Sequence, residues 1–135
     1  MKVRTGFVSN SSSSSFLVAY NEDSALYVEK NEEKNVVLTF EEFLHFVEDK
    51  GYNAYCSERT ELVADGFENV KDWIVDDGWR DSEFVSHLMN EVTEALKNYK
   101  NVAVIRIEYS DKISRRMLDL FVKLADVKML NSEDE

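Results

Sequence analysis

The chain has 135 residues, of which 27 are acidic and 16 are basic, so its formal net charge is -11 at pH 7. This length suits one domain with a buried core, and the hydrophobic fraction of 44% is close to the globular average. The charge argues against nucleic acids and anionic membranes as direct partners and favours cationic ones. Because acidity also serves solubility, the position of the charges matters more than their sum.

The composition also bears on the compartment. Cys56 is the only cysteine, which excludes an internal disulfide and fits a reducing environment. No apolar run approaches the roughly 20 residues that span a bilayer. Lys2 and Arg4 are followed by a polar stretch, unlike the apolar core of a secretory signal. We therefore expect a cytoplasmic protein.

The first third of the chain is rich in strand patterns. The serine run Ser11–Ser15 is either part of a flexible leader or a loop between a short first strand and a second strand at Phe16–Tyr20. Two further strands are predicted at Ala25–Glu29 and Val36–Leu38. The polar stretch Lys30–Asn35 between them suits a hairpin connection.

A helix is predicted to begin at Thr39. Thr39 and Glu42 have the spacing of a capping box, and Gly51 stands where a helix often ends. The apolar side chains repeat at helical spacing. They are Phe40, Phe43, Leu44 and Val47.

The middle of the chain contains one ambiguous segment and one short helix. Either Tyr52–Cys56 or Glu61–Ala64 is expected to be extended. Asp65 followed by Glu68 suggests a second cap, which would open a helix over Phe67–Asp76. The side chains predicted to point inward from that helix are Val70, Trp73 and Ile74.

The remaining elements complete an α+β pattern. A helix is predicted over Ser82–Tyr99, a central strand over Asn101–Tyr109, a helix over Ile113–Ala125 and a short strand over Val127–Leu130, before a loose acidic tail at 131–135. Strands followed by helices indicate a single α+β domain over 1–135. We expect a largely antiparallel sheet of about four to five strands, covered by three to four helices.

Known catalytic and metal-binding patterns are missing from the sequence. His45, His87 and Cys56 lack the paired spacing of zinc ligands, and the four glycines form no phosphate-binding loop. Ser86 and His87 are adjacent on a predicted helix and therefore do not face each other. We expect no catalytic residues, no cofactor and no metal, and hence a protein that is not an enzyme.

Acidic residues concentrate between Glu58 and Glu83, where nine acids face three bases and give a net charge of -6 in 26 residues. Glu68, Asp72 and Asp76 recur every four residues, which places them roughly 6 Å apart along one side of a helix. Like charges at this spacing destabilise a helix, and acids at its C-terminal end oppose its dipole. The candidate partner-binding residues are Glu61, Asp65, Glu68, Asp72, Asp76, Asp77, Trp79, Asp81 and Glu83.

Such a row of carboxylates is similar to the phosphates of a DNA strand. A protein that binds DNA with lysine and arginine would meet a comparable field on it. Phe67, Trp73 and Trp79 are interleaved with the acids and either pack in the core or contact a partner. Trp79, in a predicted turn beside Gly78, is the candidate anchor.

The segment Thr5–Phe16, TGFVSNSSSSSF, resembles the opening of small proteins of large bacteriophages and some bacteria. With its size and acidity, the chain resembles small acidic host-takeover proteins of phages, among them DNA-mimicking inhibitors of the nucleoid protein HU. The resemblance covers about a tenth of the chain and carries no site residues. It implies a non-enzymatic inhibitor that occupies the basic DNA-binding surface of a host protein, without binding nucleic acid itself.

Three other functions fit the same composition. One is an enzyme with an unfamiliar active site, which a deep pocket in the structure would indicate. An immunity or antitoxin-like protein would use an acidic patch to block a basic nuclease, and a toxin gene next door would indicate it. An accessory protein without mimicry would spread its acids evenly over the surface. Neither the partner nor the oligomeric state follows from the sequence.

Overall fold

The computed structural model describes residues 13–48, 60–76 and 82–130. It combines four helices with antiparallel sheets in the described residues, which confirms the predicted α+β class. In chain order the elements are β1 (Ser13–Tyr20), β2 (Ala25–Lys30), β3 (Glu33–Thr39), α1 (Phe40–Glu48), β4 (Glu61–Asp65), α2 (Phe67–Val75), α3 (Ser82–Ala95), β5 (Asn101–Glu108), α4 (Lys112–Leu124) and β6 (Val127–Met129).

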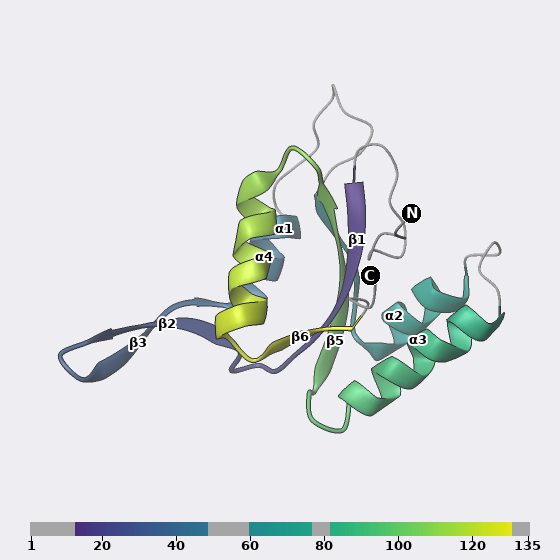
Figure 1. Cartoon of the computed structure of the whole chain (residues 1–135), viewed down its shortest axis with the longest axis horizontal. Coiled ribbons are helices and arrows are strands. Elements are labelled where there is room, and N and C mark those ends of the chain that lie inside the picture. Colours follow the sequence, from purple (N-terminus) through teal and green to yellow (C-terminus); the bar gives the residue numbers. More distant parts are fainter. Residues whose placement is uncertain (1–12, 49–59, 77–81, 131–135) are drawn as a thin grey trace, which may run out of the picture.

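Four of the strands form an antiparallel sheet in the order β4-β5-β1-β6 (Figure 1). Strand β1 pairs with β5 along its whole length, from Ser13 opposite Glu108 to Tyr20 opposite Asn101. Strand β5 is therefore central, as its dense β-branched sequence predicts. The serine run is not simply a loop or leader, because its last three residues belong to β1.

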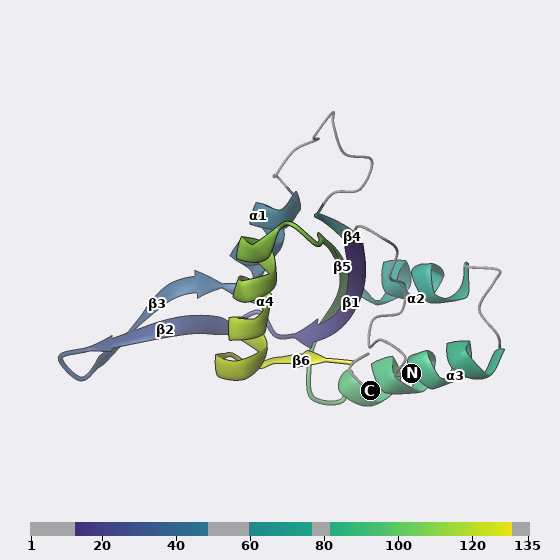
Figure 2. The same cartoon turned by 45° about the horizontal axis from the view of Figure 1, so that its top comes forward.

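Helices cover both faces of this sheet (Figures 1 and 2). On one face α1 and α4 pack around Phe16 and Val18 of β1, and on the other α2 and α3 pack around Leu17 and Ala19. Successive side chains of a strand point to opposite faces, so a strand buried on both sides needs a continuous apolar run. The sequences FLVAY in β1 and VAVI in β5 meet that need.

The α1–α4 side contains a cluster of aromatic rings. Phe40 lies at the centre, with ring centroids 4.9 Å from Tyr20, 5.6 Å from Phe43 and 5.1 Å from Phe121. All four side chains are almost completely buried. Each aromatic pair in such an arrangement contributes about 0.5–1.5 kcal/mol beyond the burial of its area.

The predicted capping box at the start of α1 is confirmed. The Thr39 backbone N–H donates to Glu42 Oε1 at 2.9 Å, and the Glu42 N–H donates to Thr39 Oγ1 at 3.0 Å. The predicted inward residues of this helix are all buried. Gly51 and the alternative strand Tyr52–Cys56 lie outside the described residues, whereas the second candidate strand is present as β4.

Strands β2 and β3 form a separate two-stranded sheet that extends away from the body of the molecule (Figures 1 and 2). We call it the arm. The predicted hairpin is confirmed, but its connection is shorter than the polar stretch Lys30–Asn35, because the strands continue to Lys30 and Glu33 and leave only two residues between them. Both turn residues have positive φ, 55° at Asn31 and 63° at Glu32, as in the tight turns that match strand twist.

Two predicted helix boundaries also differ. Asp65 does not cap α2, because it is the last residue of β4, paired with Ala103, and the N-cap is Gly66 with no side-chain hydrogen bond. Gly66 has φ 94° and ψ 154°, a conformation that is essentially restricted to glycine. Helix α3 ends at Ala95, before the predicted Tyr99, and short hydrogen-bonded turns follow it.

Candidate functional site

Helix α2 presents one side to the sheet and the other to solvent. Val70 and Ile74, four residues apart, are fully buried against the α2–α3 side of the core. Glu68, Asp72 and Asp76 are exposed. The structure therefore brings together the three acids that the sequence predicts as a row, and we call them the acidic stripe.

No ion pair neutralises the acidic stripe in the part of the chain that the structure describes. Within residues 13–48, 60–76 and 82–130, no ion pair or side-chain hydrogen bond engages Glu68, Asp72 or Asp76. The last turn of α2 contains no basic residue, and Asp76 forms the C-cap. Repulsion at i,i+4 costs about 0.2–0.5 kcal/mol per pair, and the helix dipole adds to that cost. Helix stability therefore does not account for these residues.

Glu61 differs from the acidic stripe because its charge is compensated. It lies opposite Arg106 in the β4–β5 ladder, and the two side chains form an ion pair. Both side chains are about one-third exposed, at 28% and 32%. Glu61 thus contributes to the pairing of two strands and adds little free negative charge to the surface.

The other predicted partner-binding residues are divided between α3, β4 and undescribed segments. Glu83 is exposed in the first turn of α3, where a carboxylate interacts favourably with the helix dipole. Asp65 accepts a hydrogen bond from the Tyr20 hydroxyl. Asp77, Trp79 and Asp81 lie outside the described residues.

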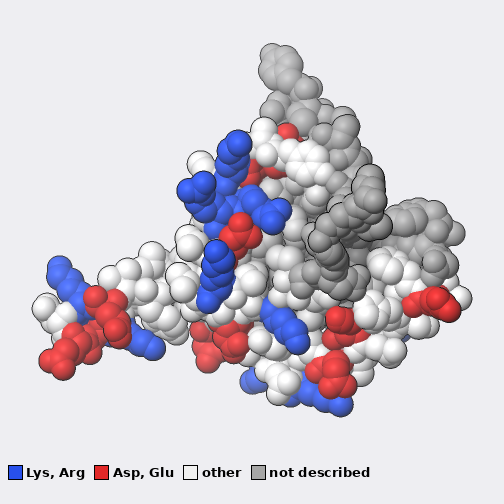
Figure 3. Space-filling model, viewed as in Figure 1, with Lys and Arg blue, Asp and Glu red and all other residues white. Residues whose placement is uncertain are grey.

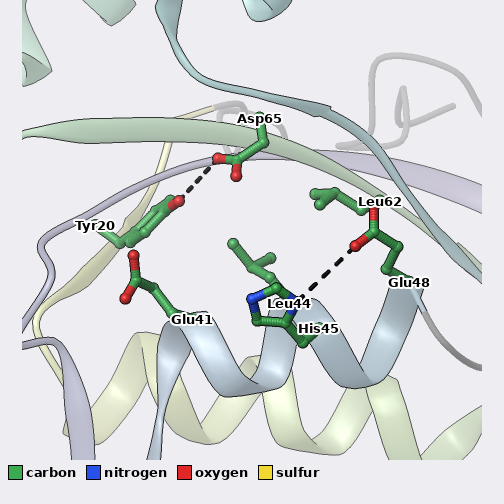
Figure 4. Close-up of a pocket in the computed structure, with 7 residues that line it drawn as sticks. All are labelled: Tyr20, Glu41, Leu44, His45, Glu48, Leu62 and Asp65. Carbon is green, nitrogen blue, oxygen red and sulfur yellow. Dashed lines mark hydrogen bonds and ion pairs between the residues drawn. The ribbon is translucent and has the colours of Figure 1, made fainter.

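A small cavity lies between α1 and the end of β4 (Figure 4). Its volume is about 170 Å³, and carboxylates from both elements surround it. The Tyr20 hydroxyl donates to Asp65 Oδ1 at 2.8 Å, and His45 Nδ1 lies 3.9 Å from Glu48 Oε1. The lining residues are Tyr20, Glu41, Leu44, His45, Glu48, Leu62 and Asp65.

The cavity environment favours the protonated form of the Tyr20 hydroxyl. Burial raises the pKa of Tyr20, and the hydrogen bond to Asp65 and the negative charges of Asp65 and Glu41 raise it further. The phenol therefore stays protonated and serves as a hydrogen-bond donor. The volume is below the roughly 300–1,000 Å³ of typical ligand sites. No cluster of three or more potential metal ligands occurs in the described part of the chain.

A basic surface on α4 was not predicted from the sequence. Lys112, Arg116 and Lys123 are exposed on this helix at spacings of four and seven residues. Figure 3 shows lysine and arginine side chains gathered over α4. That periodicity is readable in the sequence. The charges of the molecule are therefore separated, with bases over α4 and the acidic stripe on α2, across the sheet.

Comparison with known proteins leaves the function to physical argument. No family model, no curated protein and no solved structure matches the chain. No helix within the described ranges is long and apolar enough to cross a membrane.

Proposed function

We propose that this protein is a non-enzymatic DNA mimic, which binds through its acidic stripe to the basic nucleic-acid-binding surface of another protein. The observation that supports this most is the exposure of Glu68, Asp72 and Asp76 without an ion pair among the described residues, at a cost to their own helix. Residues that destabilise their own helix without making a compensating stabilising contact are candidates for function.

The surroundings of the acidic stripe suit a protein partner. Phe67 and Val75 on the same helix are 37% and 50% exposed, which offers apolar contacts next to the charges. Protein interfaces combine such apolar contacts with charge complementarity, and the latter accelerates association. The lysines and arginines of a DNA-binding protein would pair with the carboxylates as they pair with phosphates.

An HU-type nucleoid protein is the first candidate partner, because the opening segment Thr5–Phe16 resembles phage host-takeover proteins. The direct test is titration of the chain with HU at low and high salt, with duplex DNA as competitor. We expect binding that weakens with salt and is displaced by DNA. Binding that persists in excess DNA, or no binding at low salt, would exclude mimicry of this partner.

Charge reversal locates the binding surface. The triple variant Glu68→Lys, Asp72→Lys and Asp76→Lys should weaken binding by about tenfold or more, since each lost pair removes a favourable contact and adds a repulsive one. The matched control reverses the three tail acids, Glu133, Asp134 and Glu135, and changes the net charge equally. Equal weakening by both variants would indicate a diffuse field and not a site.

A further inference from the structure

The arm exposes several large apolar side chains that no other part of the described structure covers. Tyr27, Val28, Val36 and Val37 are between 46% and 58% exposed. Tyr27 lies directly opposite Val36, whereas Val28 lies on the other face of the two-stranded sheet, so apolar side chains are exposed on both faces. A two-stranded sheet is at best marginally stable alone, so an arm of this kind gains stability if another surface covers it.

Helix α4 exposes a second apolar surface beside its bases. Ile113, Leu120 and Leu124 are 67%, 40% and 72% exposed. They are spaced seven and four residues apart and lie along one flank of the basic row Lys112–Arg116–Lys123. The arm and α4 together hold seven of the eleven large hydrophobic residues that are exposed in the described part of the chain.

The arm and α4 have net charges of opposite sign. The arm, Ala25–Thr39, contains three acids and two bases, a net charge of -1, and two further acids, Glu22 and Asp23, precede it. Helix α4 contains four bases and one acid, a net charge of +3. All five charged residues of the arm are exposed, as are Glu22 and Asp23 before it. Figure 3 shows bases gathered over α4, and acids together with bases near the tip of the arm. Each surface thus complements the other in charge and in apolar character.

The two surfaces lie on the same side of the main sheet. Helix α4 packs against β2, and Leu26 and Leu38 at the base of the arm pack against the core beneath α1 and α4. The tip of the arm extends away from its own α4 (Figures 1 and 2), so the exposed surfaces are separated within one molecule. A two-fold axis between two molecules can place each arm on the other's helix.

We propose that the chain forms a symmetric dimer in which the arm of each copy packs on α4 of the other. The occupant of both surfaces is then a second copy of this chain. An anionic membrane or a nucleic acid fits less well, because the net charge of the chain, -11, repels either.

The proposal predicts complementation between two charge-reversed variants. The arm variant is Glu29→Lys, Glu32→Lys and Glu33→Lys, and the helix variant is Lys112→Glu, Arg116→Glu and Lys123→Glu. In each homodimer both contacts would then join like charges, so the dimer dissociation constant should rise by about tenfold or more. In the mixture both contacts join opposite charges, so the variants should form a heterodimer.

Sedimentation velocity over a concentration series measures these states, and circular dichroism verifies that each variant is folded. The control is reversal of the acidic stripe at Glu68, Asp72 and Asp76, which should leave the dimer intact even though it weakens partner binding. A wild-type chain that stays monomeric at about 100 μM, whether or not it binds anionic vesicles or DNA, would overturn the proposal. So would variants that dimerise like wild type, or a mixture that does not associate.

Discussion

The Tyr20 hydroxyl donates a 2.8 Å hydrogen bond to Asp65 Oδ1, although the two residues are 45 positions apart in the chain. Tyr20 ends β1 and Asp65 ends β4, with β5 between the two strands. The ring of Tyr20 packs on Phe40 in the aromatic cluster, whereas Asp65 immediately precedes Gly66 at the start of α2. This bond therefore links the core on one side of the sheet to the beginning of the helix that carries the acidic stripe.

Removal of this hydroxyl should destabilise the fold. Tyr20→Phe keeps the packing on Phe40 and removes only the donor to a carboxylate, which is worth about 1.5–3 kcal/mol for a charged acceptor. Urea unfolding measures the loss. The matched control is Tyr27→Phe, whose ring is 46% exposed on the arm and whose free energy of unfolding should change by less than about 0.5 kcal/mol. Equal effects would show that the Tyr20 hydroxyl has no special role.

Stability should also fall at alkaline pH because of the same residue. The pKa of Tyr20 is raised above its ordinary value of 10.0 by burial, by the hydrogen bond to Asp65 and by negative charge nearby. The folded protein thus holds the proton to higher pH than the unfolded chain, so this contribution is complete below pH 10 and is lost as pH rises above it. Urea unfolding of wild type and Tyr20→Phe from about pH 8 to about pH 11 should show the difference narrowing. A constant difference would contradict this origin.

Glycine in place of Glu32 should stabilise the turn of the arm. Glu32 has φ 63°, a left-handed conformation that costs a non-glycine residue about 1–2 kcal/mol. Glu32→Gly also creates the Asn-Gly pair that this type of turn favours. We expect slower hydrogen exchange of the β2–β3 amides, equivalent to about 1 kcal/mol. Glu32→Ala removes the same charge without freeing φ and should give no such protection; equal protection would assign the effect to charge.

Reversal of the charge at Asp76 should stabilise the folded protein. Asp76→Lys replaces an acid at the C-terminal end of α2 by a base, which removes repulsion from Asp72 and interacts favourably with the helix dipole. The free energy of unfolding should rise by about 0.5–1 kcal/mol, while binding to the basic partner weakens. Asp76→Asn should give a smaller gain in stability. A loss of stability on reversal would mean that Asp76 supports the fold.

The sequence pattern predicted the features that depend on residues close together in the chain. The capping box of Thr39 and Glu42 closes within one turn, so its sequence spacing is sufficient to place the start of α1. The dense apolar run of β5 likewise indicates a strand buried on both faces. The acidic stripe is a helical spacing and was readable for the same reason.

Predictions failed where a distant partner competes for a residue. Asp65 has the sequence context of a cap, but pairing with Ala103 holds its backbone in β4, and Tyr20 takes its carboxylate. Ser13–Ser15 have a low strand propensity, yet pairing with β5 makes them part of β1. Long-range hydrogen bonds outweighed local preference in both cases.

By itself, the sequence determined the α+β class, the apolar faces of the helices and the acidic stripe, since periodicity and spacing within one element fix them. Only the tertiary structure decided which of the acidic side chains form ion pairs. It paired Glu61 with Arg106, left Glu68, Asp72 and Asp76 exposed, and set the arm apart from the main sheet. Charge compensation depends on the neighbours that strand pairing brings together, and that pairing joins residues far apart in the chain.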